Sequence, residues 1–157
     1  MRLVTRIAGY QLILAMLALT VMGSVTVADV VLKYVANRPI VGAYDLVESL
    51  LPVVVFHGLP ATLLRRQTIV IDLVDHLVSP SGRRGLMLAA DLVIVGLLLL
   101  LTWAMIPPAL QTLEYGDRKL ELRLPLIVVW GVAILGMVGA ALAAIAVATR
   151  PRPAKAD

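Results

Sequence analysis

Five ionisable residues lie inside or beside long apolar stretches of this 157-residue chain: Asp29, Asp45, Glu48, His57 and Asp91. Placing an ionisable side chain in a lipid bilayer is costly, so each of them is a candidate for function. The chemistry they could perform is the binding and transfer of a proton or a cation. A structural role, in which the charge is paired or hydrated at a helix end, is the alternative for each.

The strongest pair is Asp45 and Glu48, which are three residues apart and share one side of a helix near its N-terminus. Carboxylates at this position favour the helix dipole and are partly hydrated. The sequence therefore favours stabilisation of the helix end, with ion pairs to Lys33 or Arg38 across a short turn. The alternative is that the two carboxylates relay a proton or a cation.

Asp29, Asp91 and His57 each have a simple structural explanation. Asp29 is four residues before Lys33, which suits an ion pair on one helix face. Asp91 lies one turn into its apolar stretch and can reach the membrane surface. His57 is the deepest of the polar groups, where a lone histidine usually donates to a carbonyl group or a neighbouring helix. A proton-carrying histidine is the alternative.

No catalytic, cofactor or metal site is predicted. The chain has no Cys, and no second His or carboxylate accompanies His57 at the spacing of metal ligands. Nucleophile–base pairs and phosphate-binding glycine loops are also missing from the sequence. A membrane-embedded enzyme or assembly factor would need a lipid or cofactor held by His57 and Asp91.

These residues are carried by four apolar stretches, at residues 7–31, 41–64, 86–108 and 124–149. About 20 helical residues cross a hydrocarbon core of about 30 Å, and each stretch is longer. The composition agrees, with 61% hydrophobic and 15% charged residues and a mean hydropathy of +0.96. We predict an all-α integral membrane protein, with one domain over residues 1–149 and four antiparallel, up-and-down transmembrane helices.

The basic residues predict the orientation of this domain. Nine Lys and Arg residues lie at the two ends of the chain and in the second loop, and five lie in the first and third loops. The positive-inside rule then places both termini and the second loop in the cytoplasm. The net charge of +4 is scattered between apolar blocks, so nucleic acid binding is not expected.

The second loop has a helical pattern of its own. Apolar and polar residues alternate with a helical period from about residue 68 to 79. This predicts a short amphipathic helix in the cytoplasmic membrane interface, with Arg65 and Arg66 at its start and Asp72 on its polar face. A plain continuation of the second span is the alternative. Residues 150–157 are predicted to form a disordered cytoplasmic tail.

Two further patterns concern the last part of the chain. Polar and apolar residues alternate strictly from Lys119 to Leu124, which predicts an extended third loop. In the fourth span, Gly136, Ala140 and Ala144 recur every four residues. Small residues at this spacing let two helix backbones approach closely, so we predict a helix-packing face there.

Three stretches resemble one known family. They are residues 30–37, which end the first span with Lys33, Tyr34 and Asn37; residues 42–48, with Tyr44 and Glu48; and residues 63–74 around Arg65 and Asp72. The Leu124–Pro125 start of the fourth span and Trp130 are also similar. In this order and spacing, over nearly the whole chain, they resemble the DctQ-like small membrane subunit of tripartite ATP-independent periplasmic (TRAP) transporters. Lys33 and Thr68 depart from the Arg and His usual in the family.

The resemblance implies an accessory role in the bacterial inner membrane. The partners would be a large multi-span permease subunit, which carries an organic acid and Na⁺, a periplasmic substrate-binding protein, and membrane lipid. Under this hypothesis Lys33, Arg38, Asp45 and Glu48 stabilise the outer helix ends or contact the binding protein. An autonomous proton-coupled transporter or exporter that uses Glu48 or His57 is the alternative function.

Overall fold

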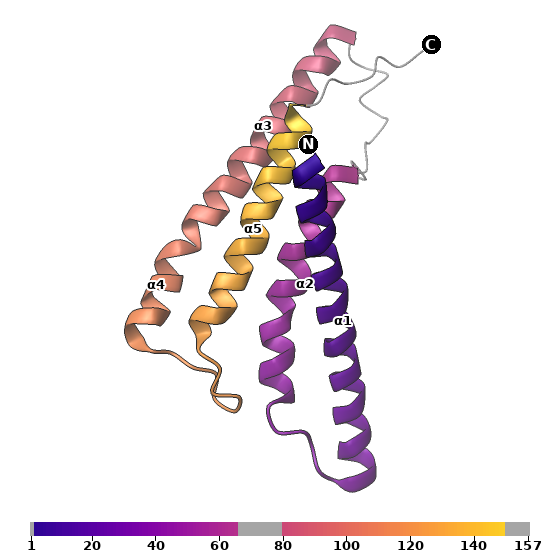
Figure 1. The fold of residues 1–157 in the computed structure, drawn as a ribbon, viewed down its shortest axis with the longest axis vertical. Coiled ribbons are helices and arrows are strands. Elements are labelled where there is room, and N and C mark those ends of the chain that lie inside the picture. Colours follow the sequence, from indigo (N-terminus) through magenta and orange to yellow (C-terminus); the bar gives the residue numbers. More distant parts are fainter. Residues whose placement is uncertain (1, 66–79, 150–157) are drawn as a thin grey trace.

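The computed structural model describes residues 2–65 and 80–149 (Figure 1). It contains the helices α1 (Arg2–Ala36), α2 (Ala43–Arg65), α3 (Pro80–Ala104), α4 (Ile106–Tyr115) and α5 (Leu126–Ala148). Four helical segments are long and apolar enough to cross a membrane, and α3 with α4 makes up the third of them. Within the described residues the only β-type pairing is an isolated bridge between Arg118 and Pro125. The prediction of an all-helical fold with four helices long and apolar enough to span a membrane is confirmed for the described residues.

Helices α1 and α3 extend past the apolar stretches that predicted them, whereas α2 and α5 keep close to theirs. The first span was expected at residues 7–31, but α1 runs from Arg2 to Ala36 and is roughly 52 Å long at 1.5 Å per residue. Arg and Lys are good helix formers, so the helix continues where its residues become polar. Likewise α3 begins at Pro80, six residues before the predicted third span, since proline is tolerated in the first turn of a helix.

A single residue, Met105, separates α3 from α4. Pro107 and Pro108 follow it and occupy the first turn of α4, where a missing backbone N–H is no loss. The chain leaves α4 at Gly116, whose φ of 66° is left-handed and whose N–H donates to the carbonyl of Thr112. This turn starts the loop that leads to α5.

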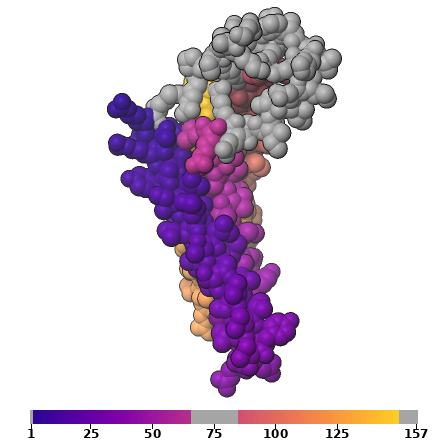
Figure 2. All heavy atoms as spheres, turned by 90° about the vertical axis from the view of Figure 1, so that its right-hand side faces the viewer, coloured from indigo at the N-terminus to yellow at the C-terminus, as the bar shows by residue number. Residues whose placement is uncertain are grey.

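Helix α5 is the centre of the assembly. It packs against α2, α1, α3 and α4, whereas α3 packs only against α5 and α4 among the described helices. The four spans therefore do not close into a symmetric bundle. Figure 2 shows the molecule from its side, as a body elongated along the helices with α1 running down the visible face.

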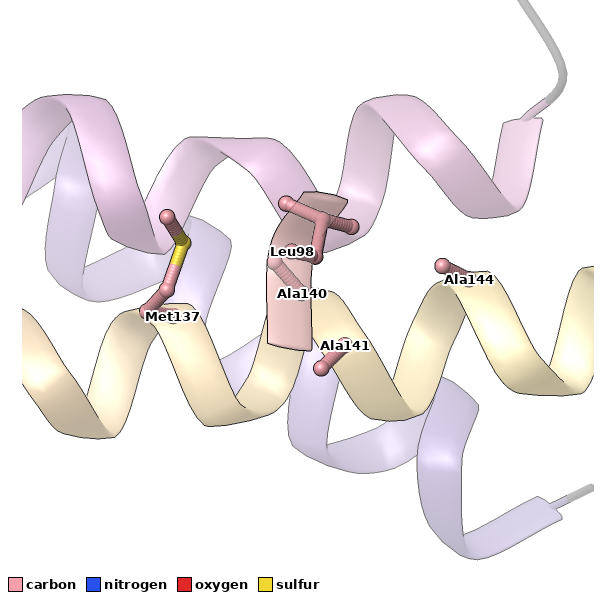
Figure 3. Close-up of a cluster of buried hydrophobic side chains, with 5 residues drawn as sticks. All are labelled: Leu98, Met137, Ala140, Ala141 and Ala144. Carbon is pink, nitrogen blue, oxygen red and sulfur yellow. The ribbon is translucent and has the colours of Figure 1, made fainter. Parts of the chain in front are cut away.

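The core where α3 meets α5 is built from small side chains. Figure 3 shows Leu98 of α3 over the alanine-rich face of α5. The buried cluster consists of Leu98, Met137, Ala140, Ala141 and Ala144. In lipid, such small residues allow close packing between backbones, which takes the place of the hydrophobic effect between helices.

Candidate functional site

Among the described residues, most polar side chains that bind from one helix or loop to another lie at one end of the molecule. There the loop between α1 and α2 meets the loop between α4 and α5 (Figure 1). Three acidic side chains and one basic side chain connect the first turns of α2 to the second of these loops. We call this group the carboxylate clasp; its side chains belong to Asp45, Glu48, Lys119 and Glu121.

Asp45 is the buried member of the clasp, with 6% of its surface exposed. Its Oδ2 accepts hydrogen bonds from the backbone N–H groups of Glu121, at 2.8 Å, and Leu122, at 3.2 Å. Because Asp45 is the third residue of α2, its negative charge also favours the helix dipole. Hydrogen bonds to a charged acceptor contribute about 1.5–3 kcal/mol each, so this residue is the main link between the two elements.

Glu121 makes the reciprocal bond. Its Oε2 accepts the backbone N–H of Gly42 at 2.6 Å, one residue before α2 begins. Gly42 has a φ of +83°, and a Cβ on it would lie 2.7 Å from the Cδ2 of Leu122. A side chain at this position would therefore be strained and would push the two loops apart.

Glu48 completes the clasp by an ion pair with Lys119. The Oε2 of Glu48 lies 2.6 Å from the Nζ of Lys119, with the two side chains 49% and 13% exposed. Partly exposed pairs of this kind contribute little because water screens them and the side chains lose entropy.

We therefore expect Glu48→Gln to lower the free energy of unfolding by less than about 1 kcal/mol. The loss should shrink further at high salt, because screening already weakens the pair. Unfolding in mixed detergent micelles at two salt concentrations measures this, with Lys119→Met as the matching change on the other side. A loss of several kcal/mol for either variant would contradict the assignment.

The predicted partners of these carboxylates were wrong. Asp45 and Glu48 bind to the loop before α5 and not to Lys33 or Arg38, whose side chains are exposed. The predicted pair between Asp29 and Lys33 is also replaced, since the Oδ1 of Asp29 accepts the backbone N–H of Ile40 at 2.6 Å. Backbone N–H groups of loop residues thus reach Asp45 and Asp29, and the side chain of Lys119 reaches Glu48.

The third loop is a hairpin-like turn, so the prediction of an extended segment was wrong for its centre. The Lys119 N–H donates to the Leu124 carbonyl, and the Leu126 N–H donates to the Asp117 carbonyl, each at 2.9 Å. Residues 120–122 form the turn between them, with Arg123 at a φ of 52°. This shape presents consecutive N–H groups to Asp45.

A second set of close contacts lies within the spans, on α5. Gly136, Ala140 and Ala144, the predicted packing face, are all buried. A Cβ on Gly136 would lie 2.7 Å from the Nδ1 of His57 and 2.9 Å from the backbone carbonyl carbon of Phe56. Thus α2 packs directly on the backbone of α5 at this position.

His57 is only 3% exposed, and its Nδ1 has no hydrogen-bond partner. It is nine residues from Glu48 on the same helix, roughly 13 Å along the axis. The open groove beside it is lined by His57 itself and by residues of α1 and α5, and Asp91 is not among them. Over residues 2–65 and 80–149, no group of three or more His, Asp or Glu side chains is placed to hold a metal ion.

Sequence reasoning missed four contributors to these sites. Lys119 and Glu121 belong to the clasp, Gly42 donates its N–H to Glu121, and Gln11 of α1 lies against Gly139 of α5. The available signals were the glycine before a helix start and a glutamine within an apolar span.

Arg65 ends α2 with an exposed side chain. Arg66, Asp72, the interfacial helix at 68–79 and the tail at 150–157 lie outside the described residues.

Comparison with known proteins gives one match. A family model for the DctQ component of tripartite ATP-independent periplasmic transporters matches residues 22–152, which is most of the chain. No curated protein and no solved structure matches the chain. The family is one of transporter components and not of enzymes, and the matched region includes the clasp and the packing face of α5. The chain, a multi-pass membrane protein with four candidate spans, therefore belongs to the DctQ family of TRAP transporter small permease components.

Proposed function

We propose that this chain is the accessory, scaffolding subunit of a TRAP-type secondary transporter. It supports a large multi-span permease subunit that takes up an organic acid together with Na⁺. A periplasmic binding protein delivers the substrate. The family match supports this function. The main observation in favour of the scaffold role is that the carboxylates of Asp45 and Glu121 accept hydrogen bonds from backbone N–H groups. They are therefore committed to structure and not to transport.

The proposed topology places the clasp on the periplasmic side. The four spans run antiparallel, up and down, through the bacterial inner membrane, with both termini and the second loop in the cytoplasm. The distribution of Lys and Arg supports this orientation. An amphipathic helix at 68–79 would then lie in the cytoplasmic interface and contact lipid.

In this arrangement the clasp keeps the periplasmic surface rigid. Lys33 and Arg38 are exposed near it, and we propose them as contacts for a partner. The chain itself needs no cofactor, and Na⁺ binds to the large subunit. The buried apolar side chains of the described spans are mainly alanines, together with Leu98 and Met137, and such close packing suits a part that stays still while a neighbouring domain moves.

Reconstitution into liposomes tests the proposal. The chain, the cognate large permease subunit and the cognate binding protein are expected to take up organic acid only when all three are present. The chain alone should transport nothing. Transport by the chain alone that Glu48→Gln or His57→Leu abolishes would overturn the scaffold role in favour of an autonomous transporter.

A further inference from the structure

The break between α3 and α4 interrupts the helical hydrogen bonding of the third span. In a continuous helix, the carbonyl groups of Trp103 and Ala104 would accept the N–H groups of the residues four positions later. Those residues are Pro107 and Pro108, which have no N–H. The N–H that follows them donates to the carbonyl of Met105 at 3.3 Å. The two prolines cost α4 nothing, but they deprive two carbonyl groups at the end of α3 of their helical donors.

These two carbonyl groups lie deep in the span. The nearest charged residues along it, Asp91 and Glu114, are 13 and 10 residues from Ala104, or roughly 20 and 15 Å along the helices. Water and lipid headgroups lie at the two surfaces of a hydrocarbon core about 30 Å thick. A backbone carbonyl without a donor inside that core is strongly unfavourable. We therefore expect a protein group to provide the donor.

The proline in the middle of α2 shows how this bundle covers such a break from within. Pro60 is fully buried, and the carbonyl of Phe56, four residues before it, lies against the backbone of Gly136 in α5. The break in the third span has no such cover. Trp103 and Ala104 are exposed, and among the described helices α3 packs only against α5 and α4.

The chemistry of the break selects its occupant. The acyl chain of a lipid covers the exposed side chains of Ile106 and Leu110 beside the break, but it has no hydrogen-bond donor. A second copy of this chain is a poor donor, because the hydroxyl groups of Thr20, Ser24 and Thr26 already donate to carbonyls of their own helix. A transmembrane helix with a Ser, Thr, Asn, Gln or Trp side chain supplies both apolar contact and a donor, which together drive helix association in lipid.

We propose that a transmembrane helix of the large permease subunit packs across the break between α3 and α4. A polar side chain of that helix donates a hydrogen bond to the carbonyl of Trp103 or Ala104. The inference rests on the proposed function and names the surface through which the two subunits associate. The two adjacent prolines thus create a polar anchor on an otherwise apolar face.

Co-purification of the cognate large permease subunit with the tagged chain, after co-expression in membranes, tests the anchor. The double variant Pro107→Ala, Pro108→Ala restores the two N–H groups, so the carbonyls are satisfied within the helix. We expect it to lower the retained large subunit severalfold, as the loss of one hydrogen bond between helices in lipid would. Leu92→Ala is the matched control on α3. It removes an exposed apolar side chain away from the break and should leave retention unchanged.

The thermal stability of the isolated double variant in detergent should equal or exceed that of the wild type, because alanine is the better helix former. Equal retention by the double variant and the wild type would overturn the inference, as would an equal loss in Leu92→Ala. If the wild-type chain itself fails to retain the large subunit, the proposed function fails and this inference with it.

Photochemical cross-linking identifies the occupant independently of the proline variants. Benzoylphenylalanine in place of Trp103, in the full complex in cell membranes, is expected to cross-link to the large permease subunit. A product with a second copy of this chain, or with phospholipid alone, would contradict the proposal. Cross-linking to phospholipid while the large subunit still co-purifies would leave the proposed function standing and place the contact between the subunits elsewhere.

Discussion

Gly136→Ala is expected to destabilise the protein by about 1–3 kcal/mol, the usual cost of inserting a methyl group into a closely packed core. The added Cβ would lie 2.9 Å from the backbone carbonyl carbon of Phe56 and 2.7 Å from His57 Nδ1. Alanine is the better helix former by about 0.5–1 kcal/mol, which offsets part of this loss. The steric clash outweighs the gain in helix propensity, because a helix backbone cannot move aside as a side chain does. Gly136→Val should cost more.

Two other glycines of α5 provide matched controls. A Cβ on Gly131 meets nothing within 4 Å, so Gly131→Ala should be neutral or slightly stabilising. The three atoms nearest to a Cβ on Gly139 all belong to the end of the Gln11 side chain, which can swing away, so Gly139→Ala should cost less than Gly136→Ala. Adding Gln11→Ala should recover the stability of the Gly139 variant but not that of the Gly136 variant.

Unfolding in mixed detergent micelles, followed by circular dichroism, measures these differences. The expected order of stability is Gly131→Ala above Gly139→Ala above Gly136→Ala. If Gly136→Ala were as stable as Gly131→Ala, the close approach of α2 to α5 at Phe56 would be wrong.

The four spans were predictable because hydropathy reports directly on what a bilayer tolerates. Each of the four apolar stretches forms a candidate span in the structure. The ends of the helices were not predictable in this way. Arg2 and Lys33 limit an apolar stretch but are good helix residues, so α1 includes both.

The partners of the carboxylates were not predictable because they depend on how two distant loops meet. Asp45 and Glu121 are 76 residues apart, and only the packing of α2 on α5 brings them together. Sequence reasoning instead chose the nearby charges Lys33 and Arg38. It also took the alternation around Glu121 for an extended segment, although a tight turn with polar groups on one side gives the same pattern.

The packing face shows the opposite case. The four-residue spacing of Gly136, Ala140 and Ala144 placed them on one helix face, and the structure buries all three. Gly139 lies on an adjacent face, and its role follows from a contact with α1 that the periodicity of α5 alone does not contain. A spacing rule identifies one partner of a helix, whereas α5 packs against several.

Asp45→Ala is expected to release the loop before α5 and to lower the free energy of unfolding by about 2–3 kcal/mol. The change removes the charged acceptor of two backbone N–H groups, those of Glu121 and Leu122. Water at the membrane surface replaces part of the lost hydrogen bonding, which keeps the effect below the sum of two full bonds. Asp45→Asn retains one acceptor oxygen without the charge, so its loss should be smaller.

Amide hydrogen exchange gives the most direct measurement, because the two N–H groups that lose their acceptor report on the clasp themselves. Exchange at Glu121 and Leu122 should rise at least tenfold in Asp45→Ala. It should stay unchanged in Glu114→Gln, which alters an exposed carboxylate of α4 nearby. If Asp45→Ala left this exchange slow while Glu48→Gln raised it, the ion pair with Lys119 would be what holds the loop. The buried carboxylate would then be secondary to an exposed charge pair, which the 6% exposure of Asp45 and its short bonds argue against.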